Sequence, residues 1–321
     1  MADALTTTAS LAVDQTAYDR YLYFALRPEM YFDPVADVGP TNQSMPGAAV
    51  VFTIISDLSV ASSALNQSVD VDAVAMADSQ VTVTLVEYGN AVKTTAKLRG
   101  TSFVSLDPAV ANVVGYNAGV SMDTVARDVL KAGDNVRYAT GGTTDPTARN
   151  TVEPGDILTA WDVRRALADL RGANVATIMN GYYKSYIHPD VSFDLRGETG
   201  AAAWRDPHTY SQPGEIWAGE LGAFEGFSFI ETPRAPVFAD AGSSTTLTDV
   251  YRTIFIGRQG LAKAHSITDG NGAYPKMVIT PVVDNLRRFV GMGWYHLAGY
   301  GIFRQASVRS VESSSSIGTN A

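Results

Sequence analysis

Three side chains that can bind a divalent metal lie within one short segment of the chain. His188, Asp190 and Asp194 fall within seven residues of one another, and imidazole nitrogens and carboxylate oxygens are metal ligands in proteins. If the three side chains converge, this segment is the candidate centre of a metal-dependent hydrolase. The chain has only four histidines, so this is also its best candidate for histidine-based catalysis.

The element that would carry these side chains does not favour a metal site. Residues Tyr182–His188 have the pattern of a β-strand, and Pro189-Asp190 is typical of a turn. Side chains of a strand point alternately to opposite faces, whereas a metal site needs at least three convergent ligands. We therefore favour a strand end followed by a turn.

Other motifs for chemistry are weak or absent. Gly291-Met-Gly293 with Gly299 resembles a dinucleotide-binding fingerprint, but His296 occupies the position of the third glycine and no strand–turn–helix unit surrounds it. The sequence has no Gly-x-Ser-x-Gly elbow, no phosphate-binding Gly-Lys-Ser/Thr motif and no cysteine. We expect no catalytic, cofactor-binding or metal-binding residues, and hence a protein that is not an enzyme.

Charge is distributed unevenly along the chain. Residues 1–90 hold eleven acids and two bases and carry the whole net charge of −9, so residues 91–321 are neutral. Binding to free nucleic acid needs a clustered basic face, and we do not expect it. The candidates for non-specific phosphate contact all have acids nearby, at Asp162, Asp169 or Asp284; they are Arg164, Arg165, Arg171, Arg287 and Arg288.

Membrane association is not expected either. The longest apolar stretches, such as Ala48–Ile55, are far shorter than the roughly 20 residues of a membrane span. The N-terminus lacks the basic and apolar regions of a signal peptide.

The first hundred residues predict an arm and a hairpin. Residues 1–48 combine aromatic residues with prolines and show no sustained period, which predicts an arm lying on another subunit or over its own domain. A strand is predicted at Ala49–Ile55, and two more flank Gly89-Asn90, which is typical of a tight hairpin turn. Because this hairpin, Gln80–Leu98, is polar on both faces, we expect a mobile flap or a strand pair that awaits a partner.

A long helix is predicted next. Asp107 is its N-cap and Pro108 its first helical residue, and its apolar residues recur at three- and four-residue steps up to Gly133. Gly115 and Gly119 inside it predict a kink or close packing against another backbone.

A second helix begins at Thr159, which forms a weak capping box with Asp162, and ends at Gly172. Arg165 and Asp169 are expected to pair on its exposed side. Its predicted buried stripe is Ala160, Val163, Leu167 and Leu170.

The remaining chain is predicted to be strands and loops. A strand is expected at Glu225–Thr232 after a loop through Gly200 and Pro213, and the strands of Phe289–Val311 pack back on the main body. The tail Ser313–Ala321 is polar and is expected to fray.

The order of these elements resembles that of a major capsid protein of a tailed bacteriophage with the Hong Kong 97-type fold. Five segments are more specifically similar to the coat protein family typified by coliphage N-four. The resemblance covers roughly residues 108–312. The segments are Asn117–Thr124, Tyr182–Val191 with Phe193–Arg196, Trp204–His208, Gly214–Gly222 and Gly226–Thr232.

The resemblance implies an α+β chain with six parts. They would be an N-terminal arm (1–48), an extended β-hairpin loop (49–101), a peripheral domain with the long helix (102–176), an axial domain (177–285), return strands of the peripheral domain (286–312) and a polar tail (313–321). It also implies a coat protein that self-assembles through pentamers and hexamers into an icosahedral head around double-stranded DNA. Scaffold, portal and decoration proteins are further candidate partners, and assembly would take place in the host cytoplasm.

Two alternatives stay open beside this interpretation. An encapsulin-like nanocompartment shares the fold and would enclose cargo enzyme in place of DNA. More remotely, the chain is a metal-dependent hydrolase that uses His188, Asp190 and Asp194.

Joints between subunits are expected to be non-covalent. Some relatives of this fold cross-link neighbours through a hairpin lysine and a distant asparagine. Here Lys93 and Lys97 lie on the predicted return strand and not at the hairpin tip, and Asp57–Asp78 contains no lysine. The acidic arm and hairpin are expected to contact basic patches on neighbours, such as those around Arg127, Lys131 and Arg137, so that assembly weakens as salt rises.

Overall fold

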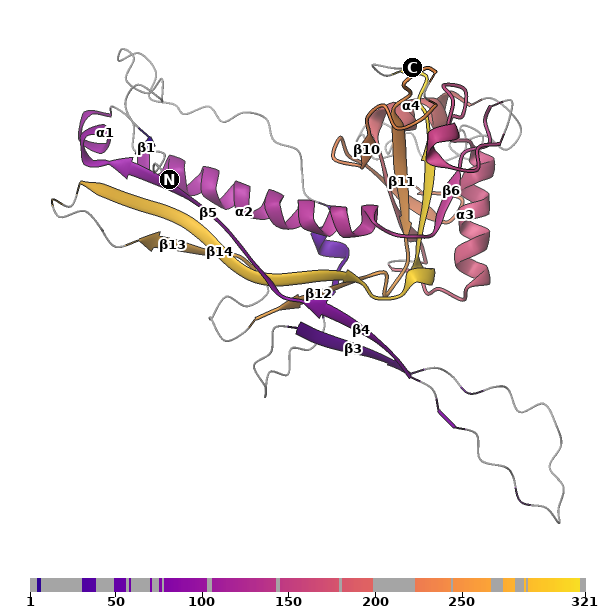
Figure 1. Ribbon diagram of the computed structural model, residues 1–321, viewed down its shortest axis with the longest axis horizontal. Helices are drawn as coiled ribbons and strands as arrows, with labels where there is room; N and C mark the ends of the chain where they lie inside the picture. Colours follow the sequence, from indigo (N-terminus) through magenta and orange to yellow (C-terminus); the bar gives the residue numbers. More distant parts are fainter. Residues whose placement is uncertain are drawn as a thin grey trace.

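An elongated part and a compact part follow one another along the long axis of the molecule (Figure 1). The elongated part is the long helix α2 with helix α1 and a six-stranded sheet, and the compact part is a seven-stranded sheet with helices α3 and α4. The computed structural model describes residues 5–6, 31–38, 49–55, 58, 70, 75–76, 78–102, 106–142, 145–178, 181–198, 223–243, 245–266, 274–280, 286 and 288–317.

Two long strands form the centre of the elongated part. β5 and β14 pair antiparallel from Val86↔Ala298 to Thr95↔Phe289, and α2 covers one face of this sheet by packing Val114, Ala118 and Met122 against Trp294 and Ala298. The strand order is β1-β5-β14-β12-β2, with β13 also paired to β14. The elements are β1 (Leu5–Thr6), η2 (Asp33–Val35), β2 (Asp37–Val38), β5 (Val86–Thr95), α1 (Ala96–Thr101), α2 (Leu106–Lys131), β12 (Leu261–His265), β13 (Lys276–Thr280) and β14 (Phe289–Ile302).

The compact part has its own apolar core. Phe227, Phe229 and Phe255 meet edge-to-face or tilted inside it, and α3 closes one side of the sheet. The strand order is β6-β15-β11-β7-β9-β8, with β10 paired to β11. The elements are β6 (Val136–Tyr138), η3 (Arg149–Thr151), α3 (Ala160–Gly172), β7 (Tyr183–Ile187), α4 (Pro189–Gly197), β8 (Ala223–Phe224), β9 (Phe227–Glu231), β10 (Val237–Phe238), β11 (Val250–Ile256), η5 (Gln305–Ser307) and β15 (Val308–Ser313).

The hairpin is formed by different strands from those predicted. β3 (Ala49–Ile55) pairs with β4 (Asp78–Thr84), whereas β5 runs straight through Gly89-Asn90 along β14. The predicted tight turn is therefore wrong, because an edge of β14 was available to pair with the whole of this strand. Lys93 accordingly lies in β5 and Lys97 in α1, and neither is on the hairpin.

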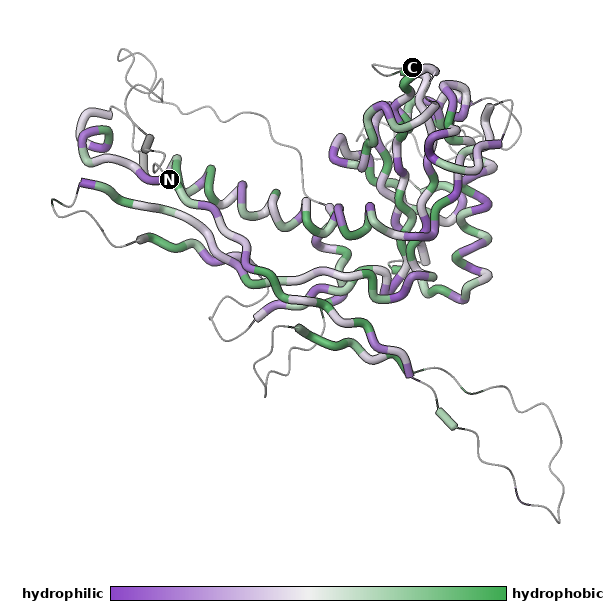
Figure 2. The backbone as a smooth tube through the Cα atoms, viewed as in Figure 1, coloured by the Kyte–Doolittle hydropathy of each residue, from purple (hydrophilic) through white to green (hydrophobic). Residues whose placement is uncertain are grey.

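The true hairpin is not polar on both faces. Figure 2 shows β3 coloured as hydrophobic along much of its length. Val50 and Phe52 pack beneath β12 against Val83 and Ala262. On the opposite face Val51 and Ile55 are 50% and 63% exposed.

The long helix agrees with its prediction in extent, beginning one residue before Asp107 and ending two residues before Gly133. Close packing at Gly115 does not occur among the described residues, where a Cβ added at this position would meet no atom within 4 Å. Gly133 is buried against the backbone of Leu130.

Helix α3 confirms the predicted cap and the predicted buried stripe. The Thr159 backbone N–H donates to the Asp162 carboxylate at 3.2 Å, and Ala160, Val163, Leu167 and Leu170 are buried. The partner predicted for Asp169 is wrong, because Asp169 accepts from Arg137 at 2.5 and 2.7 Å. This helix packs in the core of the compact part, although residues 102–176 were expected to form one domain with the long helix.

Two further expectations need correction. The segment after His188 is not a turn but helix α4, in which Pro189 occupies the first position, where its missing N–H costs nothing. The start of the tail does not fray, because Ser313, Ser314 and Ser315 are buried and the Ser314 N–H donates to the Asp156 carbonyl at 2.9 Å. The predicted loop through Gly200 and Pro213 lies outside the described residues.

The return strands divide between the two parts. β14 lies in the elongated sheet, whereas β15 pairs with β11 and β6 in the compact sheet. None of the helices among the described residues has the length and apolar character of a membrane span.

Candidate functional site

The structure places His188, Asp190 and Asp194 at α4 but gives each a structural partner of its own. His188 is the N-cap of α4, and its Nδ1 accepts from the Asp190 backbone N–H at 3.3 Å. The Asp190 carboxylate accepts from the Tyr251 hydroxyl at 2.8 Å, and that of Asp194 accepts from the Ser316 backbone N–H at 2.8 Å. No cluster of three potential metal ligands occurs in the part of the chain that the structure describes.

The state of His188 agrees with a capping role. Burial lowers the pKa of the imidazole, against the opposing effect of Asp190 and Glu231. A neutral ring leaves Nδ1 free to accept the hydrogen bond that begins the helix. The metal-dependent hydrolase interpretation therefore has no assembled centre among these three residues.

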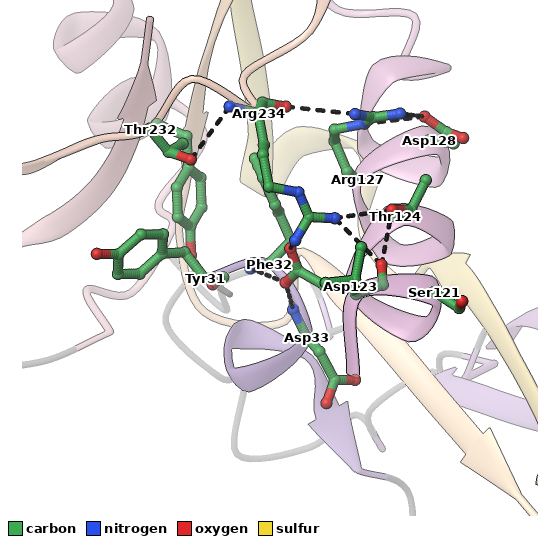
Figure 3. Close-up of polar contacts among 12 residues, drawn as sticks. Tyr31, Phe32, Asp33, Ser121, Asp123, Thr124, Arg127, Asp128, Thr232 and Arg234 are labelled. Atoms are coloured by element: carbon green, nitrogen blue, oxygen red, sulfur yellow. Dashed lines mark hydrogen bonds and ion pairs between the residues drawn. The ribbon is translucent and has the colours of Figure 1, made fainter. Parts of the chain in front are cut away.

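A buried carboxylate joins three segments at the point where the elongated and compact parts meet (Figure 3). Asp123, on α2, has no exposed surface. Its Oδ1 accepts from the backbone N–H groups of Phe32 at 2.7 Å and Asp33 at 3.0 Å, and its Oδ2 lies 2.7 Å from Nη1 of Arg234. One side chain of α2 thus holds both the segment before β2 and the turn after β9.

Arg234 extends this connection along the helix. Its Nη2 donates to the Val120 carbonyl at 3.1 Å and to the Thr124 hydroxyl at 2.7 Å. Arg127 in turn lies 2.7 Å from Asp128 and donates to the Arg234 carbonyl at 3.5 Å. The guanidinium of Arg234 therefore bridges the compact part and one face of α2 (Figure 3).

Burial dominates the electrostatics of this site. Desolvation raises the pKa of Asp123, although the hydrogen bonds from Asp33 and Phe32 and the charge of Arg234 act in the opposite direction. Buried charges are tolerated when they are paired and hydrogen-bonded. Removing either partner would leave the other charge buried and unpaired, so the ion pair fixes the orientation of the compact part relative to α2.

Apolar packing surrounds the same junction. Phe32 is fully buried in a cluster with Ala126 and Leu130 of α2 and Ile254 of β11, and its ring centroid lies 4.5 Å from that of Tyr186. Residues 31–38 consequently lie on their own chain, which is one of the two arrangements expected for the arm. The arm residues 1–4, 7–30 and 39–48 lie outside the described residues.

A second buried polar group adjoins Phe32. Lys263 is 3% exposed and its Nζ lies 2.7 Å from Oδ1 of Asp33, which also accepts from the Tyr300 hydroxyl at 2.5 Å. His296 is fully buried nearby, and neither ring nitrogen has a hydrogen-bond partner among the described residues. Burial, with the charges of Lys263 and His265, lowers the pKa of His296 to about 4.

Sequence reasoning missed Asp123 and Arg234, although a signal was present. Asp123 follows Met122 and lies three residues before Ala126, on the apolar face of the predicted helix. A carboxylate on such a face must find a buried partner. The identity of that partner, 111 residues further on, could not be read from the helix.

Four of the cations proposed for phosphate or subunit contact have an acidic partner within this chain. Arg127 and Arg137 form ion pairs with Asp128 and Asp169. Arg164 lies 3.5 Å from Glu225, and Arg165 lies 3.9 Å from Asp162. Lys131 differs, because its ammonium lies 4.3 Å from the ring centroid of Phe238. Arg287 lies outside the described residues.

The fold is that of viral capsid proteins. The chain is similar to the capsid of Ralstonia phage GP4 (TM-score 0.75, 14% identity, 100% of each chain covered). It is also similar to the capsid asymmetric unit of cyanophage Pam1 (TM-score 0.72, 13% identity, 98% of this chain and 100% of that chain covered). Mycobacterium phage Che8 provides a third likeness (TM-score 0.62, 15% identity, 92% and 96% covered). Comparison with curated protein sequences gives no match.

Residues 7–317 match the family model described as phage capsid protein, and the chain belongs to this family. It is a major capsid protein, a subunit of the shell of a phage head. The expected Hong Kong 97-type capsid fold is thereby confirmed.

Proposed function

We propose that this capsid protein closes an icosahedral head through pentamers and hexamers, encloses double-stranded DNA and has no catalytic activity of its own. Assembly takes place in the host bacterial cytoplasm, and scaffold, portal and decoration proteins are the further partners. The observation that carries the proposal is the β3–β4 hairpin, which lies beneath β12 (Figure 1) and leaves apolar side chains on its other face exposed.

An isolated two-stranded hairpin is only marginally stable in water. Here one face of β3 packs on Val83 and Ala262, while Val51 and Ile55 expose about half or more of their surface. A neighbouring subunit that covers this second face removes apolar surface from water at roughly 25 cal/mol per Å². Ring contacts are heterologous, so each hairpin meets a different surface of the next subunit.

The division into arm, hairpin loop, peripheral domain, axial domain and return strands is part of the proposal, with refined boundaries. The hairpin loop is better limited to residues 49–84, because β5 and α1 belong with the elongated sheet. The elongated part corresponds to the peripheral domain. The compact part, including α3 and β15, corresponds to the axial domain.

Negative-stain microscopy of the full chain, expressed alone and with its neighbouring gene products, tests the proposal. Closed particles of uniform diameter are expected. Persistence of single 34.2 kDa chains under every condition would contradict it. Boiled particles should give one band of that mass in a denaturing gel, since the joints are non-covalent; a ladder of multiples would show covalent joints.

The encapsulin-like alternative is distinguished by what the particles contain. Family membership supports a phage head. Particles recovered from infected cells should hold nuclease-protected DNA. A stoichiometric cargo enzyme without DNA would favour the compartment instead.

A further inference from the structure

An open cavity of about 550 Å³ lies where α2 meets the compact part, and three cationic side chains line it. Lys131 comes from the last turn of α2, Arg149 from η3 and Arg252 from β11. They surround Phe238, whose ring centroid lies 3.5 Å from the Arg149 guanidinium and 5.3 Å from that of Arg252. Three separate elements thus bring positive charge to one aromatic side chain.

Two of these cations share one carboxylate. Glu312 is fully buried, and its Oε1 accepts from Arg149 at 2.7 Å and from Arg252 at 2.5 Å. Arg252 also donates to the carbonyls of Lys131 and Gly133, which satisfies the end of α2. One carboxylate balances only one of the two guanidiniums, so a positive charge is left over.

The other acids at the cavity remove only part of the positive charge. Asp128 is paired with Arg127 at 2.7 Å, and Asp134 accepts from the uncharged amide of Gln305 at 2.9 Å. Among the described residues no carboxylate lies within ion-pair distance of Lys131. The cavity and its wall thus carry one positive charge in excess, because four cations face three carboxylates. The cations are Arg127, Lys131, Arg149 and Arg252, and the carboxylates are Asp128, Asp134 and Glu312.

We propose that this cavity is a phosphate-binding site, in which Lys131 and the free edge of Arg149 hold one backbone phosphate of DNA. The assignment of this phosphate to DNA rests on the proposed function, in which the shell encloses double-stranded DNA. A phosphodiester carries a single negative charge, which matches the single surplus positive charge. Arginine presents a planar fork to phosphate and lysine a point charge. The acidic segment Asp57–Asp78 of another copy would bring four carboxylates and no base to this one surplus charge.

Fluorescence anisotropy of a labelled mixed-sequence DNA duplex with the unassembled full chain tests this site. The Lys131→Gln variant should bind the duplex about 3- to 10-fold more weakly, and the slope of log affinity against log salt should fall by about one. Lys97→Gln is the matched control, because Lys97 is an exposed lysine on α1 at the far end of the elongated part (Figure 1). It should change binding much less.

Competition identifies the ligand. Inorganic phosphate should displace the duplex from the native chain better than sodium chloride of equal ionic strength, and less so from Lys131→Gln. Equal effects of the two lysine variants, or equal displacement by phosphate and chloride, would overturn the site. Displacement by a peptide of residues 57–78 that depends on Lys131 while phosphate has no such effect would assign the cavity to a second copy and also overturn it.

The test of the phosphate site and the test of the proposed function can fail independently of each other. Particle formation by the same native preparation is scored by microscopy. Normal particles with unchanged DNA binding by Lys131→Gln would refute only the phosphate site, whereas failure of the native chain to form particles would count against the proposed function.

Discussion

Asp123 and Arg234 form an ion pair of 2.7 Å between the long helix and the compact part, with side-chain exposures of 0% and 10%. The same carboxylate accepts the backbone N–H groups of Phe32 and Asp33. Three segments that lie about ninety or more residues apart in sequence therefore depend on one side chain for their relative position.

Replacing Asp123 by asparagine should destabilise the chain strongly. Asparagine keeps an acceptor for the N–H groups of Phe32 and Asp33 but leaves the guanidinium of Arg234 buried without a counter-charge. Breaking such a pair costs about 3–5 kcal/mol, measurable as a lower midpoint in urea unfolding of the unassembled chain. Asp128→Asn, one and a half turns along the same helix, removes a pair whose acid is 53% exposed and should cost no more than about 1 kcal/mol. Equal losses in the two variants would contradict the junction role of Asp123.

Phe32→Ala tests whether the segment before β2 is part of the folded core. Phe32 is fully buried, so truncation should lower the free energy of unfolding by about 3–5 kcal/mol. Phe193 is 53% exposed on α4, and Phe193→Ala in the unassembled chain should cost much less. A negligible effect of Phe32→Ala would mean that this segment leaves the junction in solution.

The stability of the native state should fall as the pH drops from about 6.5 to about 4. The folded chain holds the pKa of His296 at about 4, below its usual value near 6.5, so over this window the unfolded state takes up a proton that the folded state refuses. The loss reaches about 3 kcal/mol over the whole window and then ceases for this group.

Urea unfolding at pH 6.5 and pH 5 measures this dependence. His296→Leu should lose about 2 kcal/mol less than the native chain between these two values. The lowered pKa values of His188 and His265 have the same sign and leave a residual slope in the variant. An unchanged slope would show that His296 is accessible to protons in the folded chain.

The exposed face of β3 should be required for assembly and not for folding. Ile55 is 63% exposed, so Ile55→Asp should leave the melting temperature of the unassembled chain within a few degrees of native while reducing particle yield at least several-fold. Ile55→Val, which keeps an apolar side chain, is the control and should assemble normally. Particle counts by microscopy and the unassembled fraction by size-exclusion chromatography measure the result. Normal assembly of Ile55→Asp would mean that this face is not covered in the shell.

Local patterns predicted two of the helices, α2 and α3, well. The cap formed by Thr159 and Asp162 and the apolar period up to Leu170 located α3 closely, because capping and burial of one helical face depend on residues within a few turns. The apolar steps from Val110 onward likewise predicted α2. Helix α4 was missed because Pro189 and Asp190 suit both a turn and the first turn of a helix.

By itself, the sequence determined the approximate limits of α2 and α3, the absence of thiol chemistry and the concentration of negative charge in residues 1–90. The fold decided which strands and charges meet. Gly89-Asn90 suits a tight turn, yet β5 pairs through it with β14, some two hundred residues further on. Asp123 likewise found its partners in Phe32, Asp33 and Arg234. The physical reason is that periodicity reports which face of an element is apolar, whereas long-range packing and the need to satisfy buried polar groups select the partner for that face.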